Sequence, residues 1–332
     1  MNKILFLLLL AVLISTSSFA QKGKFEIKGK LSGFADSTII YLDNLTTPSP
    51  VHIDSTLVIN NQFQFNGSIK EVMRVMLRTI NFSDYKYFWL ENTAIEFKAE
   101  KGKFRGAIIT GSETQNEQTR LDSAIKTNGK EKEQSISFIR NHPGSIISGD
   151  ILSTYASTWG KDTAAILYRN LSEKMKATYY GRNIREFIAL NKNIKIGDRY
   201  VDFTEPNVEG KKISLSDFQG KVVLLEFWGS WCGPCRQGNP ELVKIYNEFK
   251  NTGFDILGVA ADDKKEDWIE AIQKDSLTWQ NVTDLRGDKN RAALIYGVSY
   301  YPANFLVDRN GIIIAKDLRG DALRNKLREL LK

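Results

Sequence analysis

Three patterns of hydrophobic and polar positions follow one another along this chain. Between residues 23 and 109, apolar and polar residues alternate in short runs separated by Gly, Asn, Asp and Pro, which is typical of half-buried β-strands. Residues 112–191 carry apolar residues at helical spacing. From about residue 194, strand-like and helix-like segments alternate, which predicts an α/β sheet. The expected fold is a C-terminal α/β domain preceded by a small antiparallel β domain and a helical connector.

The first two segments contain local signals that agree with this division. Seven alternating runs predict seven strands, and Asn60-Asn61 between two of them predicts a hairpin turn because asparagine tolerates positive φ. Ser112, with Gln115 three residues later, resembles a helix capping box. We therefore place a β-rich domain at 21–111, a helical connector at 112–192 and the α/β domain at 193–332.

The α/β segment begins with a continuous apolar run, KVVLLEFW, which only Glu226 interrupts. Such a run predicts a strand buried on both faces of a sheet. The elements expected after it are a helix over 235–250, a strand over 254–262, a helix over 264–275, a hairpin over 303–318 and a closing helix over 321–332.

The start of the chain resembles a secretory signal. Lys3 precedes an apolar run from Ile4 to Ile14, and Ser18-Phe19-Ala20 supplies the small residues that signal peptidase needs. The apolar run is well short of the roughly 20 residues that span a bilayer. We therefore expect cleavage before Gln21, residues 1–20 as a signal peptide, a location in the periplasm or cell envelope, and no stable membrane span afterwards.

The charged residues do not form a basic patch. The 46 basic residues are interleaved with 39 acidic ones, and loss of Lys3 with the signal would lower the formal charge from +7 to +6. Because a nucleic-acid site would need a clustered basic face, no nucleic-acid partner is expected. The length predicts two or three folding units.

Both cysteines of the chain, Cys232 and Cys235, lie in one CxxC after the apolar run. A disulfide between them would close a very small ring, which constrains the unfolded chain little, so structural stapling explains the pair poorly. The strand-to-helix junction places Cys232 at a helix N-terminus, where the helix dipole stabilises a thiolate. We expect Cys235, one turn further in, to be less exposed and to need a base. Glu226 is the candidate base, and a structural role for Glu226 is the alternative.

The segment EFWGSWCGPC resembles the active-site segment of thioredoxins. Residues from about 194 to 332 resemble exported thiol-disulfide oxidoreductases of the ResA/TlpA group, within the AhpC/TSA-like superfamily. The resemblance implies a thioredoxin-like fold, with Cys232 as the nucleophile, Cys235 as the resolving thiol and Glu226 as the buried acid. The region before it resembles, more loosely, the β-rich and helical regions attached to such domains, without a chemical motif.

The resemblance also implies a substrate groove beside the two cysteines. Pro302 matches the proline that follows a cis peptide bond in the family and faces the disulfide across this groove. The other residues that the resemblance assigns to the groove are Trp231, Gly233, Pro234 and Tyr301.

Three positions depart from the family pattern. Gly238 stands where related proteins often carry an acidic residue, Ala303 follows the proline in place of the common threonine, and Gly258 replaces the strand lysine beside the buried acid of thioredoxins. These departures predict that proton transfer depends on Glu226 and water alone.

The expected function is reduction of disulfides in exported proteins through a mixed disulfide, with a membrane electron donor that reduces the pair again. The residues between the cysteines, Gly233 and Pro234, favour a reductase, and the resemblance makes apocytochrome c a candidate substrate. No metal and no cofactor besides the redox-active disulfide is expected, because a zinc site needs more ligands than one CxxC supplies. Two alternatives remain: a thiol peroxidase, although the chain has Trp-Gly-Ser-Trp in place of PxxxTxxC, and a non-enzymatic envelope binding module.

Overall fold

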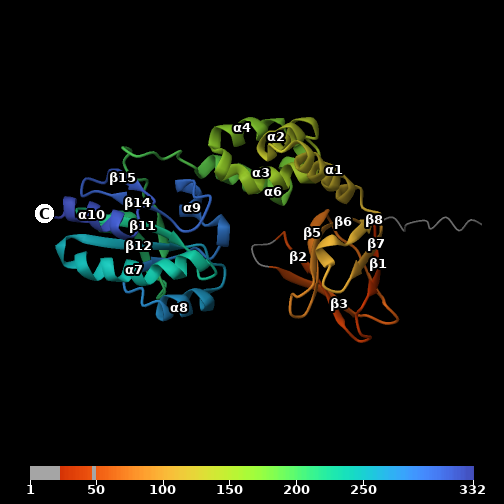
Figure 1. The fold of residues 1–332 in the computed structure, drawn as a ribbon. Coiled ribbons are helices and arrows are strands. Elements are labelled where there is room, and N and C mark those ends of the chain that lie inside the picture. Colours follow the sequence, from red (N-terminus) through yellow and green to blue (C-terminus); the bar gives the residue numbers. More distant parts are fainter. Residues whose placement is uncertain (1–22, 47–49) are drawn as a thin grey trace, which may run out of the picture. The chain divides into compact units, whose positions relative to one another are not determined.

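The computed structural model describes residues 23–46 and 50–332, so the predicted signal peptide lies outside the described residues. The described residues form two compact units, one of 23–42 with 53–115 and one of 43–46 and 50–52 with 116–332. Figure 1 follows the elements of each unit along the chain. Within the described ranges, no helix has both the length and the apolar character needed to cross a membrane.

The N-terminal region consists of two four-stranded sheets, with strand orders β4-β1-β7-β8 and β3-β2-β5-β6. All seven predicted strands are present, and a short eighth strand was not predicted. The pairs β1–β4, β5–β6 and β7–β8 are antiparallel, as predicted for this domain, and β1 also pairs with β7 in parallel. The strands are β1 (Phe25–Ser32), β2 (Ile39–Asn44), β3 (Val51–Leu57), β4 (Gln62–Gly67), β5 (Met73–Thr79), β6 (Tyr85–Leu90), β7 (Ala94–Glu100) and β8 (Ile108–Thr110).

The local signals in this region have the predicted effect. Asn60 and Asn61 both have positive φ, 50° and 62°, and they form the turn between Ile59 and Gln62, whose backbone groups exchange two hydrogen bonds. The Ser112 hydroxyl accepts a hydrogen bond from the Gln115 amide at 3.0 Å, at the start of the first helix. The turn and the helix start are therefore confirmed, but β3 and β4 belong to different sheets, so the turn does not join the two strands of a hairpin.

Six helices follow the sheets. Many of their apolar positions are buried, as the helical spacing predicts. The helices are α1 (Glu113–Asn128), α2 (Glu131–Asn141), α3 (Ile146–Trp159), α4 (Lys161–Asn170), α5 (Glu173–Lys176) and α6 (Tyr179–Leu190).

The C-terminal region has a thioredoxin-like α/β fold. Its sheet has the order β13-β12-β11-β14-β15, in which β11, β12 and β13 are parallel and β14 and β15 are antiparallel to their neighbours. The predicted elements are β11 (Val222–Trp228), α7 (Gly233–Phe249), β12 (Phe254–Ala260), α8 (Lys265–Lys274), β14 (Ala303–Val307), β15 (Ile313–Lys316) and α10 (Gly320–Leu330). The sequence patterns missed the short elements β9 (Thr204–Pro206), β10 (Lys212–Ser214), β13 (Gln280–Val282) and α9 (Arg291–Tyr296).

Strand β11 lies at the centre of this sheet and is buried at every position. Val223, Leu225 and Phe227 belong to the apolar cluster that includes α9. Leu224 and Trp228 belong to the other cluster, which contains both cysteines and residues of α7, α8 and α10. Because side chains alternate along a strand, Glu226 lies on the same face of the sheet as the cysteines.

Candidate active site

The two cysteines form a disulfide at the N-terminus of α7. The Cys232–Cys235 bond joins Cα atoms that are 5.2 Å apart, and Cys232 is the N-cap residue of this 17-residue helix. Its Sγ accepts a hydrogen bond from the Cys235 amide at 3.2 Å. In the reduced protein the same amide and the helix dipole would stabilise a thiolate on Cys232.

The sequence predicted that Cys235 is less exposed than Cys232, but the two cysteines are equally buried. Both are 3% exposed in the disulfide form. The prediction that Cys235 is less exposed is therefore wrong for this state. The asymmetry between the two sulfurs comes from the helix terminus and not from their burial.

Two buried or partly buried acids hold the loop before Cys232 in place. The backbone amide of Ser230 donates to Asp262 at 3.0 Å, and the Ser230 hydroxyl donates to the same carboxylate. Arg236 donates to Asp275 and, at 3.1 Å, to the carbonyl of Ser230. The loop is therefore fixed from both β12 and α7, which orients the disulfide before any substrate arrives.

Glu226 is 5% exposed and forms an ion pair with Arg319, which the sequence did not predict. Arg319 Nη1 donates to Glu226 Oε1 at 3.1 Å, while Oε2 has no hydrogen-bond partner among the described residues. Burial raises the pKa of Glu226 to about 7, and the Arg319 charge limits the rise. A carboxyl group with such a pKa can accept and release a proton near neutral pH.

Asn304 holds the segment that carries Arg319. It pairs with Glu226 in the register of β14 and β11, donates to the Leu318 carbonyl at 2.9 Å and accepts from the Leu318 amide at 3.0 Å. This two-way contact fixes the backbone one residue before Arg319. The sequence did not predict this arginine, and the dependence of proton transfer on Glu226 and water stays a prediction.

The lysine position of thioredoxins has no room for a side chain here. Gly258 lies directly beside Glu226 in the β11–β12 register, as the resemblance implied. A Cβ on Gly258 would lie 2.3 Å from Asn281 Oδ1 and 3.2 Å from Trp228 Nε1. The positive charge beside the buried acid comes instead from the start of α10. No sequence motif marks Arg319, because 93 residues separate it from Glu226 and only the fold brings them together.

Three of the residues predicted for the substrate groove, Trp231, Gly233 and Pro234, are neighbours of the cysteines in the chain. Tyr301 packs on the apolar cluster that contains both cysteines. Gly233 and Pro234 form the first turn of α7, and the Tyr301–Pro302 peptide bond is cis. Trp231 is 57% exposed, and its ring packs edge-on against Tyr301 with centroids 5.5 Å apart. The Trp231 Nε1 donates to the Ala261 carbonyl at 2.8 Å, which fixes the exposed ring beside Cys232.

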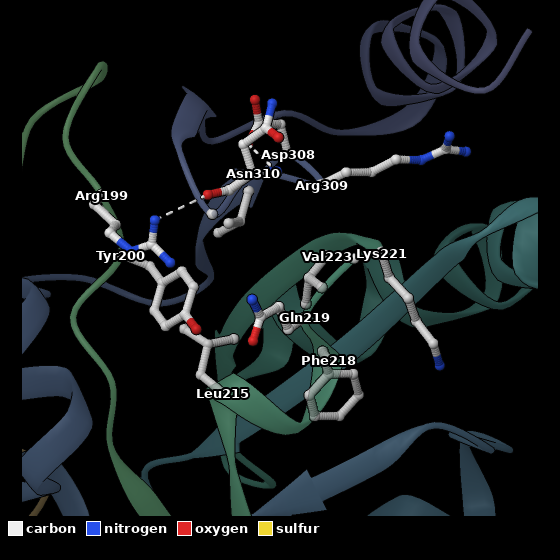
Figure 2. A pocket seen from close by; sticks show the side chains of 13 residues that line it. Arg199, Tyr200, Leu215, Phe218, Gln219, Lys221, Val223, Asp308, Arg309 and Asn310 are labelled. Atoms are coloured by element: carbon white, nitrogen blue, oxygen red, sulfur yellow. Dashed lines mark hydrogen bonds between the residues drawn. The ribbon is translucent and has the colours of Figure 1, made fainter.

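Two hollows of this unit differ in size and in their distance from the cysteines along the chain. A groove of about 440 Å³ contains Trp231 and Tyr301 in its lining. The other is a cleft of about 10 Å³ between Tyr200, Phe218 and Asn310, where Arg199 donates to the Asn310 carbonyl at 3.3 Å (Figure 2). That space holds about one water molecule, so the cleft is too small to be a ligand site.

The fold and the site together define a class. The sheet is thioredoxin-like, and it carries a CxxC disulfide at a helix N-terminus, a buried acid on the same face and a cis-proline. This arrangement is that of a thiol-disulfide exchange protein. Residues 196–316 match the AhpC/TSA family, and residues 25–118 match a domain of unknown function, DUF4369.

Known relatives identify the family within this class. The thiol-disulfide oxidoreductase ResA of Bacillus cereus is 32% identical over 146 residues, which cover 44% of this chain and 82% of the relative. ResA of Geobacillus thermodenitrificans is 30% identical over 139 residues, or 42% and 78% of the two chains. This chain belongs to the ResA thiol-disulfide oxidoreductase family, and it is a thiol-disulfide oxidoreductase.

Among solved structures, the thioredoxin domain of a thiol-disulfide oxidoreductase from Bacteroides vulgatus is 38% identical. The match covers 42% of this chain and 99% of that domain, with a TM-score of 0.40 over the chain. A thiol-disulfide oxidoreductase from Bacteroides fragilis is 39% identical and covers 40% of this chain and 100% of that one, with a TM-score of 0.39.

Proposed function

We propose that this protein reduces disulfides of exported proteins in the cell envelope by a two-cysteine mechanism. The single observation that supports this most strongly is the Cys232–Cys235 pair at the N-terminus of α7, with the Cys235 amide 3.2 Å from the Cys232 sulfur. A thiolate at this position is both a good nucleophile and a good leaving group near neutral pH.

In the first step, the Cys232 thiolate of the reduced protein attacks one sulfur of the substrate disulfide. The Cys232–substrate disulfide forms, the substrate disulfide breaks, and the other substrate sulfur leaves as a thiolate that takes up a proton. In the second step, Cys235 attacks the Cys232 sulfur. The Cys232–Cys235 disulfide forms and the first substrate sulfur leaves as a thiolate, so the substrate has gained two electrons and the protein has lost two.

Glu226 is the proposed base for the second step, because Cys235 must lose its proton before it attacks. Glu226 lies on the cysteine face of β11, and its pKa of about 7 leaves it ready to accept a proton at neutral pH. Arg319 is the proposed positioning residue, since its charge limits how far burial raises the pKa of Glu226.

The oxidised pair must then be reduced again by a dithiol donor that supplies two electrons and two protons. A membrane electron donor fits this role, because an exported protein has no cytosolic reducing pool available to it. Export itself depends on the predicted signal peptide at residues 1–20. The disulfide is the only redox group that the mechanism needs, and apocytochrome c is one candidate substrate.

Reduction of insulin disulfides with dithiothreitol as the electron donor tests this proposal. The wild-type protein should accelerate insulin reduction well above the rate with dithiothreitol alone, and Cys232→Ser should return the rate to that background. A wild-type rate equal to the background would contradict the proposed reductase activity.

A further inference from the structure

The groove beside the disulfide has a second wall that no thioredoxin motif predicts. Trp231, Tyr300 and Tyr301 line one side of it. The other side comes from the helical segment, through residues of α3 and α6. These helical residues are Ser153, Thr154, Ala156, Ser157, Asn183 and Phe187.

This second wall is fastened to the thioredoxin-like fold. Arg286 makes two hydrogen bonds to Glu186 of α6, at 2.9 and 2.7 Å. Just after α6, the buried Asn191 side chain donates to the Leu294 carbonyl of α9 at 3.1 Å, and the next backbone amide donates to the Ile295 carbonyl at 3.1 Å. These contacts fix the end of α6 against α9, so the groove is a built feature of this unit.

The lining of the groove suits a polypeptide segment. Aromatic rings in the lining offer apolar contact area, and hydroxyl groups can both donate and accept hydrogen bonds. Asp288 and Lys289 add charged groups that can pair with polar groups of a bound chain. Asn183 lines the groove, and its Nδ2 is buried without a hydrogen-bond partner among the described residues. Buried amide donors are usually paired, and the Asn amide torsion is soft enough to turn toward a carbonyl of a bound chain.

We propose that α3 and α6 form the second wall of a polypeptide-binding groove, in which the segment next to the substrate disulfide lies between these helices and the Trp231–Tyr301 edge. This inference rests on the proposed function, because it takes the occupant to be a disulfide-bearing polypeptide. The groove is continuous with the disulfide through Trp231, whose neighbour in the chain is Cys232, and through Tyr301, which packs on the cluster containing both cysteines.

The proposal predicts a difference between large and small disulfide substrates. A bound polypeptide would contact α3, whereas a small disulfide such as hydroxyethyl disulfide reaches the sulfurs without touching the helices. Filling the groove from α3 should therefore slow only the reaction with polypeptides. Thr154 is suitable for this change because it is exposed and lines the groove, and arginine is a good helix former.

The experiment mixes pre-reduced full-length protein with oxidised insulin or with hydroxyethyl disulfide and follows a single turnover by tryptophan fluorescence. For Thr154→Arg we expect the second-order rate constant with insulin to fall about tenfold, a change of about 1.4 kcal/mol. The rate constant with hydroxyethyl disulfide should stay unchanged. Thr158→Arg is the matched control, because Thr158 is exposed on the same helix and is not part of the groove lining.

Each outcome has a definite meaning. An unchanged insulin rate in Thr154→Arg would overturn the second wall, and so would equal losses with both substrates, which would show that the arginine disturbs the disulfide itself. A wild-type protein that reacts with hydroxyethyl disulfide but not with insulin would contradict the polypeptide occupant. A wild-type protein that reacts with neither would contradict the proposed function, and the groove with it.

Discussion

Replacing Glu226 with glutamine should make the folded protein more stable at alkaline pH while slowing its chemistry. The glutamine has nearly the same shape as the protonated acid but cannot ionise. Because Glu226 is 5% exposed and its pKa is raised from 4.5 to about 7, the ionised acid destabilises the fold. In the proposed mechanism, the proton chemistry of this buried acid therefore comes at a cost in stability.

The size of the effect follows from the difference in proton binding between the folded and unfolded chains. Below pH 4.5 both chains bind the proton and the free energy of unfolding is unaffected. As the pH rises through the interval from 4.5 to about 7, the unfolded chain loses the proton first, so stability falls. At about 1.4 kcal/mol per pKa unit, the total loss is about 3 kcal/mol, of which about 2.5 kcal/mol falls between pH 5 and pH 8.

Denaturant unfolding of the oxidised wild-type and Glu226→Gln proteins, followed by tryptophan fluorescence from pH 5 to pH 8, measures this difference. Four of the six tryptophans, Trp228, Trp231, Trp268 and Trp279, lie in the thioredoxin-like region, so the signal reports mainly on its unfolding. The wild type should lose about 2.5 kcal/mol relative to the variant over this range. Parallel stability curves would refute the raised pKa, and with it the argument for Glu226 as a base.

Two further changes test the surroundings of the site. Arg319→Ala removes the charge that limits the rise of the Glu226 pKa, so this pKa should rise above about 7. The pH profile of the resolving step should then move to higher pH. The control Arg328→Ala removes an arginine of α10 that pairs with Glu248, and it should leave the profile in place. Glu186→Gln breaks the ion pair with Arg286. Because the side chains of Glu186 and Arg286 are 30% and 35% exposed, the change should lower the free energy of unfolding at pH 7 by no more than about 1 kcal/mol. The Arg286 hydrogen bond lowers the pKa of Glu186 in the folded protein. The stabilisation should therefore be present above pH 4.5 and vanish as the pH falls through the lowered pKa of the folded state. A loss of stability in Glu186→Gln that persists in acid would contradict the ion-pair explanation.

The sequence predicted the parts of the fold that have a regular period. The strand alternation of the N-terminal region, the buried run of β11 and the long helices α7 and α10 all follow from patterns that one element contains by itself. The short elements β13 and α9 were missed because three to six residues carry too little periodicity. The parallel pairing of β1 with β7 joins strands from the two ends of the domain, and no local pattern encodes it.

Some residues of the candidate site can be predicted from one local motif, and others come together only through the fold. Cys232, Cys235 and Glu226 stand close together in one motif, and the sequence places them directly. Arg319 and the residues of α3 and α6 reach the site only through the fold, since each lies many tens of residues away from the motif and belongs to an element with an ordinary composition. Sequence reasoning could have found Arg319 only by asking which cation replaces the lysine missing at Gly258.

The central claim is that Cys232 exchanges with substrate disulfides and that Cys235 releases them. The most direct measurement is mass spectrometry of Cys235→Ser after reaction with oxidised insulin, with Cys232→Ser as the matched control. The account predicts one covalent adduct, held by a disulfide to Cys232, in Cys235→Ser and none in Cys232→Ser. No adduct in Cys235→Ser, or a stable adduct through Cys235 in Cys232→Ser, would contradict it.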